Sequence, residues 1–180
     1  MIIFLGPPGA GKSLQGRILA IRHGWDWISA GAVLRQQKDP KIQEILQTGN
    51  LLPSHITNRL IAERLDDEKD LSEVVLDGFP RSVDQAESLL NYFKKRGNGK
   101  IEGIIVLDVG RNELIHRLLR RGRADDTPDA IETRLNVFAT EGMQIIKYFE
   151  DHDVRVEHIM GNRSVGQVHD SIEHLVNQVL

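Results

Sequence analysis

The chain has 180 residues, of which 40% are apolar and 27% charged, and its formal net charge is −3. This length suits one domain with a sizeable hydrophobic core, and the slightly acidic balance argues against binding nucleic acid through an overall positive charge. The absence of cysteine excludes a disulfide framework and a cysteine-ligated zinc site, and it fits a reducing compartment. We therefore expect a single domain over residues 1–180.

The first apolar run, Ile2–Leu5, follows Met1 directly. It is too short for a signal sequence or a membrane span, and no basic segment precedes it. From these features we expect a cytoplasmic protein with no membrane attachment and no nucleic-acid partner.

The segment Gly6–Ser13 reads Gly-Pro-Pro-Gly-Ala-Gly-Lys-Ser and fits the phosphate-loop pattern G-x-x-x-x-G-K-[ST]. It lies between Ile2–Leu5, a predicted strand, and the amphipathic segment Leu14–Ile21, a predicted helix. In such a loop the glycines turn backbone N–H groups toward phosphate oxygens, Lys12 reaches the β and γ phosphates, and the serine hydroxyl ligates Mg²⁺. The alternative is a glycine-rich turn that binds nothing, but the complete motif in its correct context favours a nucleoside triphosphate site.

Apolar runs that resemble strands alternate with helical patterns along the rest of the chain. The run Ile104–Leu107 is apolar on both faces, as a buried parallel strand requires. This alternation predicts an α/β domain with a parallel central sheet, in which ligands bind at the carboxyl ends of the strands. Helix starts are indicated by Ser54, Ser82, Thr127 and Ser164. The predicted strands are Ile2–Leu5, Trp25–Ile28, Val74–Leu76, Ile104–Leu107 and Val154–Ile159.

Asp77 directly follows the predicted strand Val74–Leu76. A carboxylate in this position of a phosphate-loop protein holds Mg²⁺ through water, although a strand-terminal aspartate is also a common turn residue. The following residues favour the first interpretation. Gly78 permits close approach of the backbone, and Arg81 presents a guanidinium that can grip a phosphate through two parallel hydrogen bonds.

A second basic group follows later in the chain. Arg117 and Arg121 are four residues apart and share one helical face, Arg123 comes directly after the turn, and Arg134 lies on the next predicted helix. Single arginines of this kind are usually solvated, and Arg117 could pair with Glu113. In a phosphate-binding protein the cluster favours a clamp around a transferring phosphoryl group.

Together, these segments resemble the adenylate kinase family of nucleoside monophosphate kinases, and the resemblance covers essentially the whole chain. It implies a P-loop three-layer α/β fold with a five-stranded parallel sheet. It also implies a mobile monophosphate-binding flap over residues 29–58 and a very short lid over residues 121–127, which has no room for a zinc-bearing insertion. The matching segments are Gly6–Lys12, Ser29–Arg35, Gly49–Pro53, Leu76–Glu87 and Arg121–Asp126.

The resemblance also assigns roles position by position. The residues it implies for binding ATP are Gly9, Ala10, Gly11, Lys12, Ser13, Leu14 and Arg117. Those it implies for binding the monophosphate are Ala30, Arg35, Gly78, Arg81, Gln85, Arg123 and Arg134. The implied catalytic residues are Lys12, Arg81, Arg117, Arg121, Arg123 and Arg134. Ser13 and Asp77 are the implied Mg²⁺ ligands, partly through water.

The implied reaction is reversible transfer of the γ-phosphoryl group of MgATP to a nucleoside monophosphate by a monomeric enzyme. AMP is the favoured acceptor because Gln85 is retained, although this glutamine also fits a helix cap that begins at Ser82. Ala30 stands where the family usually has threonine, which leaves UMP or CMP as an alternative acceptor. Leu14 and Ala32 replace a hydroxyl and a carboxylate, and they leave open a catalytically weak nucleotide sensor.

Overall fold

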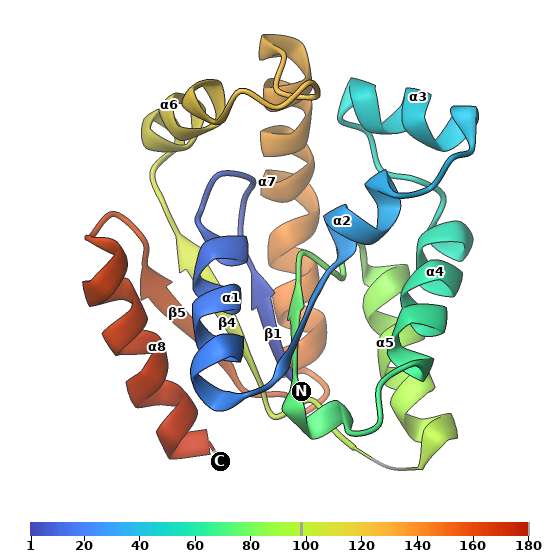
Figure 1. Cartoon of the computed structure of the whole chain (residues 1–180), viewed down its shortest axis with the longest axis vertical. Coiled ribbons are helices and arrows are strands. Elements are labelled where there is room, and N and C mark those ends of the chain that lie inside the picture. Colours follow the sequence, from blue (N-terminus) through green and yellow to red (C-terminus); the bar gives the residue numbers. More distant parts are fainter. Residues whose placement is uncertain (98, 180) are drawn as a thin grey trace.

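A computed structural model describes residues 1–97 and 99–179 of the chain (Figure 1). The described residues form one sheet of five strands, all parallel, in the order β2-β3-β1-β4-β5. The predicted fold class is therefore confirmed. The strands are β1 (Ile2–Leu5), β2 (Asp26–Ser29), β3 (Val74–Asp77), β4 (Gly103–Asp108) and β5 (Val156–Met160).

Two strands begin later than the sequence pattern predicts, and both shifts have the same cause. The Trp25 N–H donates to Ala20 O at 2.9 Å, and the Val154 N–H donates to Phe149 O at 3.0 Å. Each of these residues therefore completes the end of the preceding helix, and the strand begins one or two residues later. Apolar character alone did not distinguish a helix-closing residue from the first residue of a strand.

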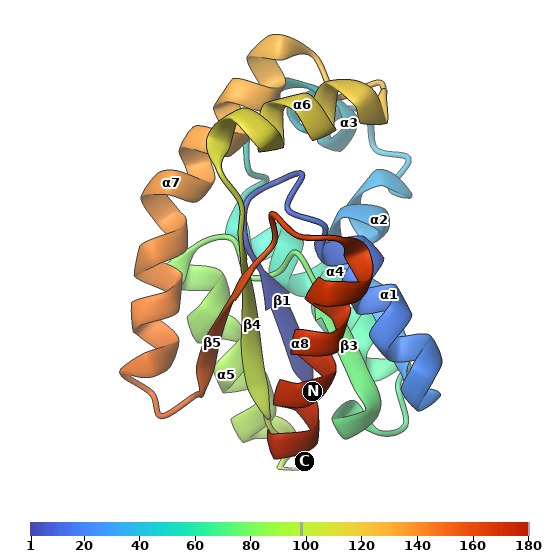
Figure 2. The ribbon, with the colours of Figure 1, turned by 90° about the vertical axis from the view of Figure 1, so that its left-hand side faces the viewer.

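Helices cover both faces of the sheet (Figure 2). Helices α1 (Lys12–His23) and α8 (Val165–Val179) pack on one face, while α5 (Val83–Arg96) and α7 (Pro128–Glu150) pack on the other, with α4 (Ser54–Asp66) alongside α5. The remaining elements are α2 (Ala30–Arg35), α3 (Pro40–Thr48), the 3₁₀ turn η1 (Leu71–Glu73) and α6 (Arg111–Arg121). None of the helices formed by the described residues is long and apolar enough to cross a membrane.

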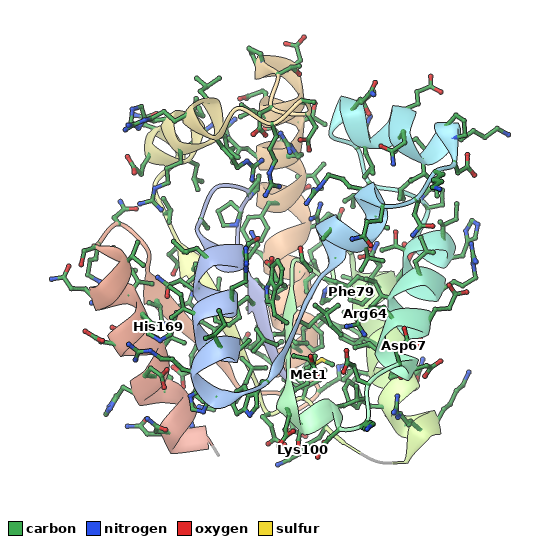
Figure 3. The ribbon with its side chains drawn as sticks, viewed as in Figure 1. Met1, Arg64, Asp67, Phe79, Lys100 and His169 are labelled. Carbon is green, nitrogen blue, oxygen red and sulfur yellow. The ribbon has the colours of Figure 1, made fainter. Side chains whose placement is uncertain are left out.

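The core consists of apolar layers on either side of the sheet. Met1 and Phe79, labelled in Figure 3, are at most 2% exposed and belong to the layer under α5 and α7. A separate small cluster of Leu34, Ile42 and Leu52 with Leu60 joins α2, α3 and α4. This cluster joins α2 and α3, which lie toward the end where the strands terminate, to α4, which runs alongside α5 (Figure 1).

The predicted helix starts at Ser82, Thr127 and Ser164 are confirmed by their hydrogen bonds. Ser82 Oγ accepts from Gln85 N at 3.4 Å, and Thr127 Oγ1 accepts from Ala130 N at 3.3 Å. Ser164 and Gln167 form the reciprocal pair of bonds of a capping box. Helix α7 therefore begins where the sequence predicts, directly after the arginine-rich turn.

Candidate active site

The loop between β1 and α1 wraps the amino end of the helix. Gly6 has a φ of +135°, and a Cβ there would lie 2.8 Å from Leu107 O on the neighbouring strand, so only glycine fits. Gly11 is the N-cap residue of α1, with a φ of +102° and no side-chain hydrogen bond to the helix. The first N–H groups of α1 are therefore not capped by a side chain of the N-cap residue, which suits an incoming anion.

Lys12 bends back over this loop. Its ammonium group donates to Gly6 O at 2.7 Å and to Pro7 O at 2.8 Å. Burial, with the nearby charges of Arg81 and Arg121, lowers the pKa of Lys12 to about 8, although Asp77 acts in the opposite direction. The cation thus lies inside the loop, bound only to neutral carbonyls that phosphate oxygens could replace.

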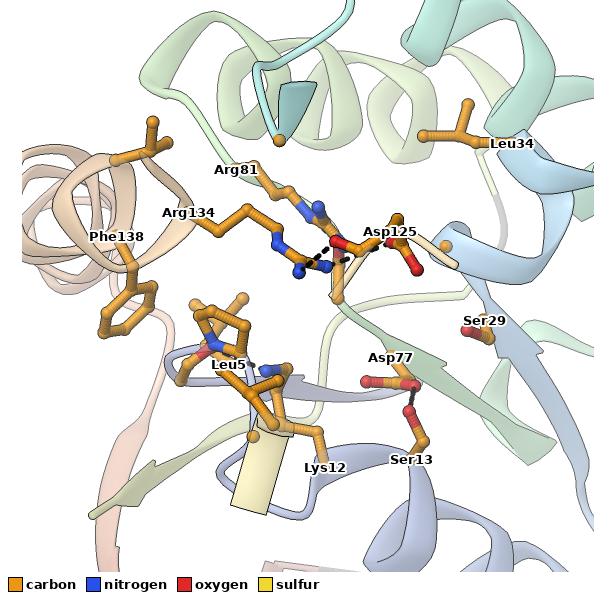
Figure 4. Close-up of a pocket in the computed structure, with 18 of the residues that line it drawn as sticks. Leu5, Lys12, Ser13, Ser29, Leu34, Asp77, Arg81, Asp125, Arg134 and Phe138 are labelled. Carbon is orange, nitrogen blue, oxygen red and sulfur yellow. Dashed lines mark hydrogen bonds and ion pairs between the residues drawn. The ribbon is translucent and has the colours of Figure 1, made fainter. Parts of the chain in front are cut away.

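Ser13 and Asp77 meet at the centre of the sheet's carboxyl end. Ser13 Oγ donates to Asp77 Oδ2 at 2.6 Å, and Asp77 is 3% exposed as the last residue of β3 (Figure 4). A hydroxyl and a carboxylate are hard oxygen donors of the kind that Mg²⁺ prefers, and Mg²⁺ in such sites takes the rest of its ligands from phosphates and water. These two residues therefore fit the predicted magnesium site.

Arg81 is positioned by its backbone neighbours. Its Nε donates to Gly78 O and its backbone N–H donates to Gln85 Oε1, both at 2.8 Å. Desolvation, followed by the nearby charges of Arg35 and Arg134, lowers its pKa. The two terminal guanidinium nitrogens make no hydrogen bond to the residues that the structure describes, so the end of the side chain that can bind phosphate is available.

Arg35 and Arg123 share this property. Within residues 1–97 and 99–179 neither side chain forms an ion pair with a carboxylate. Desolvation, Arg121 and Arg35 lower the pKa of Arg123, which means that its surroundings favour an added negative charge. We call Arg35, Arg81 and Arg123 the unpaired arginines.

The other three arginines of the cluster are held by carboxylates. Arg121 binds Asp126 through two hydrogen bonds of 2.6 and 2.8 Å. Arg134 binds the side chain of Asp125 at 3.0 Å and that of Asp126 at 2.8 Å. Arg117 donates to Glu113 at 2.7 Å, as the solvated interpretation anticipated, and also to the Gly161 carbonyl. We call Arg117, Arg121 and Arg134 the paired arginines.

Asp126 lies at the centre of these contacts, and its side chain is only 1% exposed. Burial alone raises its pKa, but the hydrogen bonds from Arg121 and Arg134 outweigh this effect and lower the pKa to about 2. The carboxylate therefore stays charged at neutral pH and fixes the turn between α6 and α7 against both helices.

One cavity of about 340 Å³ brings these side chains together. Its lining includes seven cationic side chains and three carboxylates, Asp77, Asp125 and Glu141, so a polyanion is its expected occupant. Figure 4 shows Arg81 and Arg134 next to each other, above Lys12 and Asp77. The predicted residues that line it are Gly9, Gly11, Lys12, Ser13, Leu14, Arg35, Asp77, Gly78, Arg81, Arg117, Arg121, Arg123 and Arg134.

Three predicted residues lie elsewhere. Ala30 and Gln85 line a second, smaller hollow of about 20 Å³ beside the cavity. Ala10 lines neither space, because its side chain is 3% exposed and packs in the core layer under α1. Of Ala10, only the backbone remains to contact a ligand.

Sequence reasoning missed a wall of the cavity that belongs to α7. Val137, Phe138, Glu141 and Ile145 line it beside the predicted Arg134, at spacings of three and four that place them on one helical face. That periodicity was present in the sequence, but an apolar helical face usually indicates core packing. Asp125 and Asp126 were visible in the motif and were assigned no role. Thr57, which lines the small hollow, was also missed.

Comparisons with known proteins agree with this arrangement. The sequence profile of the family described as adenylate kinase matches residues 4–154. The chain is 38% identical over 156 residues to the adenylate kinase of Mycobacteroides abscessus, covering 83% of this chain and 86% of that relative. It is also 38% identical over 173 residues to adenylate kinase 1 of a Nostoc species, covering 93% of each chain. The chain is 35% identical over 166 residues to the adenylate kinase of Mycolicibacterium smegmatis.

Proposed function

The chain belongs to the adenylate kinase family, and we propose that its cavity carries out the reaction of that family as follows. The protein is an enzyme that transfers the γ-phosphoryl group of ATP to AMP and forms two molecules of ADP. The observation that carries the proposal is that one cavity holds the phosphate loop, Asp77 and seven cationic side chains. A pyrimidine monophosphate kinase and a nucleotide sensor without turnover are not favoured.

ATP binds on the loop side of the cavity. The N–H groups of Gly9, Ala10 and Gly11 and those at the amino end of α1 donate to its phosphate oxygens, and Lys12 exchanges the carbonyls of Gly6 and Pro7 for phosphate oxygens. Leu14 lines this side and is 50% exposed, and Arg117 faces it from α6. Ser13 and Asp77 hold Mg²⁺, which when bound neutralises charge on the phosphate oxygens.

AMP binds on the opposite side. The free ends of Arg35 and Arg81 grip its phosphate, which suits guanidinium groups without a carboxylate partner. Gly78 lies beside Arg81, with Ala30 and Gln85 at the small hollow, where the base is expected. The two phosphate chains then meet between Arg123, Arg121 and Arg134.

Transfer in this site depends on position and charge. The three arginines and Lys12 surround the place where negative charge spreads over the transferring group, and they hold the donor and acceptor oxygens in line. Arg121 and Arg134 are already held in place by Asp125 and Asp126. They therefore need little reorganisation when the phosphoryl group arrives.

Parts of the protein must move for both substrates to enter. A cavity of about 340 Å³ is of the size that encloses one small ligand, whereas the reaction requires two nucleotides. We assign the movement to a flap over residues 29–58 and a lid over residues 121–127. The flap has its own small apolar cluster, and its Gly49 lies against Ala130 at the start of α7, so it roofs the cavity when closed.

An acceptor panel tests the reaction. ADP formation from MgATP is measured with AMP, CMP, UMP, dCMP and GMP, for the natural protein and for Lys12→Ala. We expect rapid turnover with AMP and a loss of about 10²–10³-fold in kcat in the variant with an unchanged thermal melt, because Lys12 contributes charge to the transition state. Near-normal kcat in Lys12→Ala would remove the loop from the mechanism, and absence of AMP turnover would contradict the assignment.

We also propose a cytoplasmic monomer. All the groups assigned above come from one chain, and the absence of cysteine suits a reducing compartment. Sedimentation at catalytic concentrations tests the oligomeric state, and a dimer with a mixed site would contradict the proposal.

A further inference from the structure

Helix α1, which begins at the phosphate loop, is tied to α8 by buried polar side chains. Gln15 lies one turn after Lys12 on α1, His169 lies on α8, and both residues are only 3% exposed. The label of His169 in Figure 3 marks its place between the two helices, which pack against each other. Burying two such groups is costly unless hydrogen bonds satisfy them, so their contacts indicate what they do.

Gln15 connects the phosphate-loop helix to the beginning of α8. Its Nε2 donates at 3.0 Å to the carbonyl of Val165, the first residue of α8. Because a backbone carbonyl only accepts, this bond fixes the orientation of the amide and turns its Oε1 toward His169. His169 Nδ1 lies 3.1 Å from that oxygen. With the amide reversed, two oxygens would face each other at Val165, so the histidine is the donor to Gln15.

Glu173 lies on the other side of the histidine ring. Its Oε1 is 3.1 Å from His169 Nε2, and its Oε2 is 3.0 Å from His23 Nε2. Burial alone raises the pKa of Glu173, but the hydrogen bond from His23 and the charges of both histidines lower it, so this carboxylate only accepts. His169 therefore meets an acceptor at each ring nitrogen, and a ring protonated on both nitrogens donates to both.

The segment that Gln15 holds also contacts the ATP side of the cavity. At its start, Gly161 O accepts from Arg117 Nη2 at 3.1 Å, and a Cβ on Gly161 would lie 3.5 Å from Ala10 O in the phosphate loop. At its end, Val165 O accepts from Gln15. The segment 161–165 is thus held by Arg117 at one end and by the phosphate-loop helix at the other.

We propose that His169 is a positioning residue for ATP binding and that it acts through Gln15. The inference rests on the proposed function. Without the ring, Gln15 Oε1 loses its donor, the amide is free to turn away from Val165 O, and α1 is no longer fixed against the segment that Arg117 also contacts. On the AMP side, Arg81 is anchored through Gly78 O instead, so AMP binding does not depend on this network.

The experiment separates the two substrates. KM for ATP, KM for AMP and kcat are measured for the natural enzyme, His169→Leu, Gln15→Leu and the double variant, with a thermal melt of each. His169→Leu should raise KM for ATP about three- to ten-fold, the effect of one lost hydrogen bond, and leave KM for AMP unchanged. Gln15→Leu should act in the same direction. Since both changes break one connection, the double variant should be no worse than Gln15→Leu.

His174→Leu, at an exposed position on the same helix, is the matched control and should change neither KM. His169→Gln keeps an N–H donor toward Gln15, so it should raise KM for ATP less than His169→Leu, and it serves if His169→Leu melts at a lower temperature.

Equal increases of both KM values in His169→Leu, or an unchanged KM for ATP, would overturn the proposal, because a merely structural role does not single out one substrate. Effects of His169→Leu and Gln15→Leu that simply added in the double variant would also contradict it. Absence of ADP formation by the natural enzyme would contradict the proposed function itself, which the first measurement of the series reports separately.

Discussion

The paired and the unpaired arginines line the same cavity but differ in what holds them. Arg121 and Arg134 are fixed by Asp125 and Asp126 at the junction of α6 and α7, and Arg134 is only 13% exposed. Arg35, Arg81 and Arg123 have no carboxylate partner within the described chain, although Arg81 is anchored through Gly78 O. One set is thus already ion-paired within the protein, whereas the other set has its full charge available to a ligand.

This difference separates two roles that a list of arginines would merge. A guanidinium held by a buried carboxylate contributes to the stability of the turn, and its removal leaves an unpaired charge behind. An arginine without a partner contributes little to folding, and its charge is available to phosphate. Substitutions in the two sets should therefore have different effects on stability and on catalysis.

The largest effect is expected from an unpaired arginine. Arg81→Ala should lower kcat/KM for AMP by about 10²–10³-fold, since it removes charge from the phosphate site, and leave the free energy of unfolding nearly unchanged. Steady-state kinetics and urea denaturation measure the two quantities. Arg59→Ala, at an exposed position on α4 that pairs with Glu63, is the matched control. If Arg81→Ala lost as much free energy of unfolding as it lost in transition-state binding, the distinction between paired and unpaired arginines would not hold.

Removing the carboxylate that holds two of the paired arginines should mainly lower stability. Asp126→Asn withdraws the partner of Arg121 and Arg134 and should lower the free energy of unfolding by about 1.5–3 kcal/mol, the range for hydrogen bonds to charged groups. Asp170→Asn, an exposed change on α8, should have no measurable effect. If urea denaturation gave equal stabilities for both variants, Asp126 would not hold the turn.

Lowering the pH should weaken the same ion pairs of Asp126 by protonating it. The pKa of Asp126 is lowered to about 2, below its value of about 3.9 in an unfolded chain. Its stabilising contribution is therefore complete above about pH 4 and is lost as the pH falls toward 2. In Asp126→Asn this part of the acid sensitivity should disappear, and the stability difference between the two proteins should narrow with falling pH.

Lys12 extends the comparison to a cation bound only to neutral carbonyls. Since its pKa is lowered to about 8, the free enzyme loses this charge above that pH, and kcat/KM should fall about tenfold per pH unit there. In the unfolded chain Lys12 keeps its proton to about pH 10.4. Between about pH 8 and 10.4 the unfolded state therefore binds more protons, and this group makes the free energy of unfolding rise with pH. Lys12→Arg should move the decline to higher pH. A decline at the same pH in Lys12→Arg would assign it to another group.

The smallest effect concerns the base. Ala30→Thr adds a hydroxyl to the small hollow and should sharpen the preference for AMP over CMP or UMP about three- to ten-fold. Equal acceptor ratios before and after the substitution would show that position 30 does not face the base.

The sequence predicted the fold and most of the cavity lining because both depend on local patterns. The phosphate loop, Asp77 at the end of β3, and Arg81 three residues after Gly78 are fixed by short segments and by strand ends that meet at one edge of a parallel sheet. The paired and unpaired states were not predictable in this way. Asp126 lies five residues from Arg121 and eight from Arg134, and only the packing of α6 against α7 brings both to it.

Thr57 illustrates the same limit on the acceptor side. In the sequence it is one polar residue within an amphipathic helix, with nothing to separate it from Thr133 or Thr140. That it lines the same small hollow as Gln85, which is 28 residues away in the sequence, appears only when α4 packs beside α5. Side chains brought together by helix packing therefore remained outside the prediction.

The most direct test of this account compares Arg123→Ala with Arg134→Ala, with kcat and the free energy of unfolding measured for both. The side chain of Arg123 has no hydrogen-bond or ion-pair partner among the described residues, so its removal should lower kcat by about 10²-fold or more and change stability by less than about 0.5 kcal/mol. Arg134→Ala should lower both, because Asp125 and Asp126 lose their shared partner. If Arg123→Ala kept its kcat, or lost as much stability as Arg134→Ala, the division of the cavity into paired and unpaired arginines would be wrong.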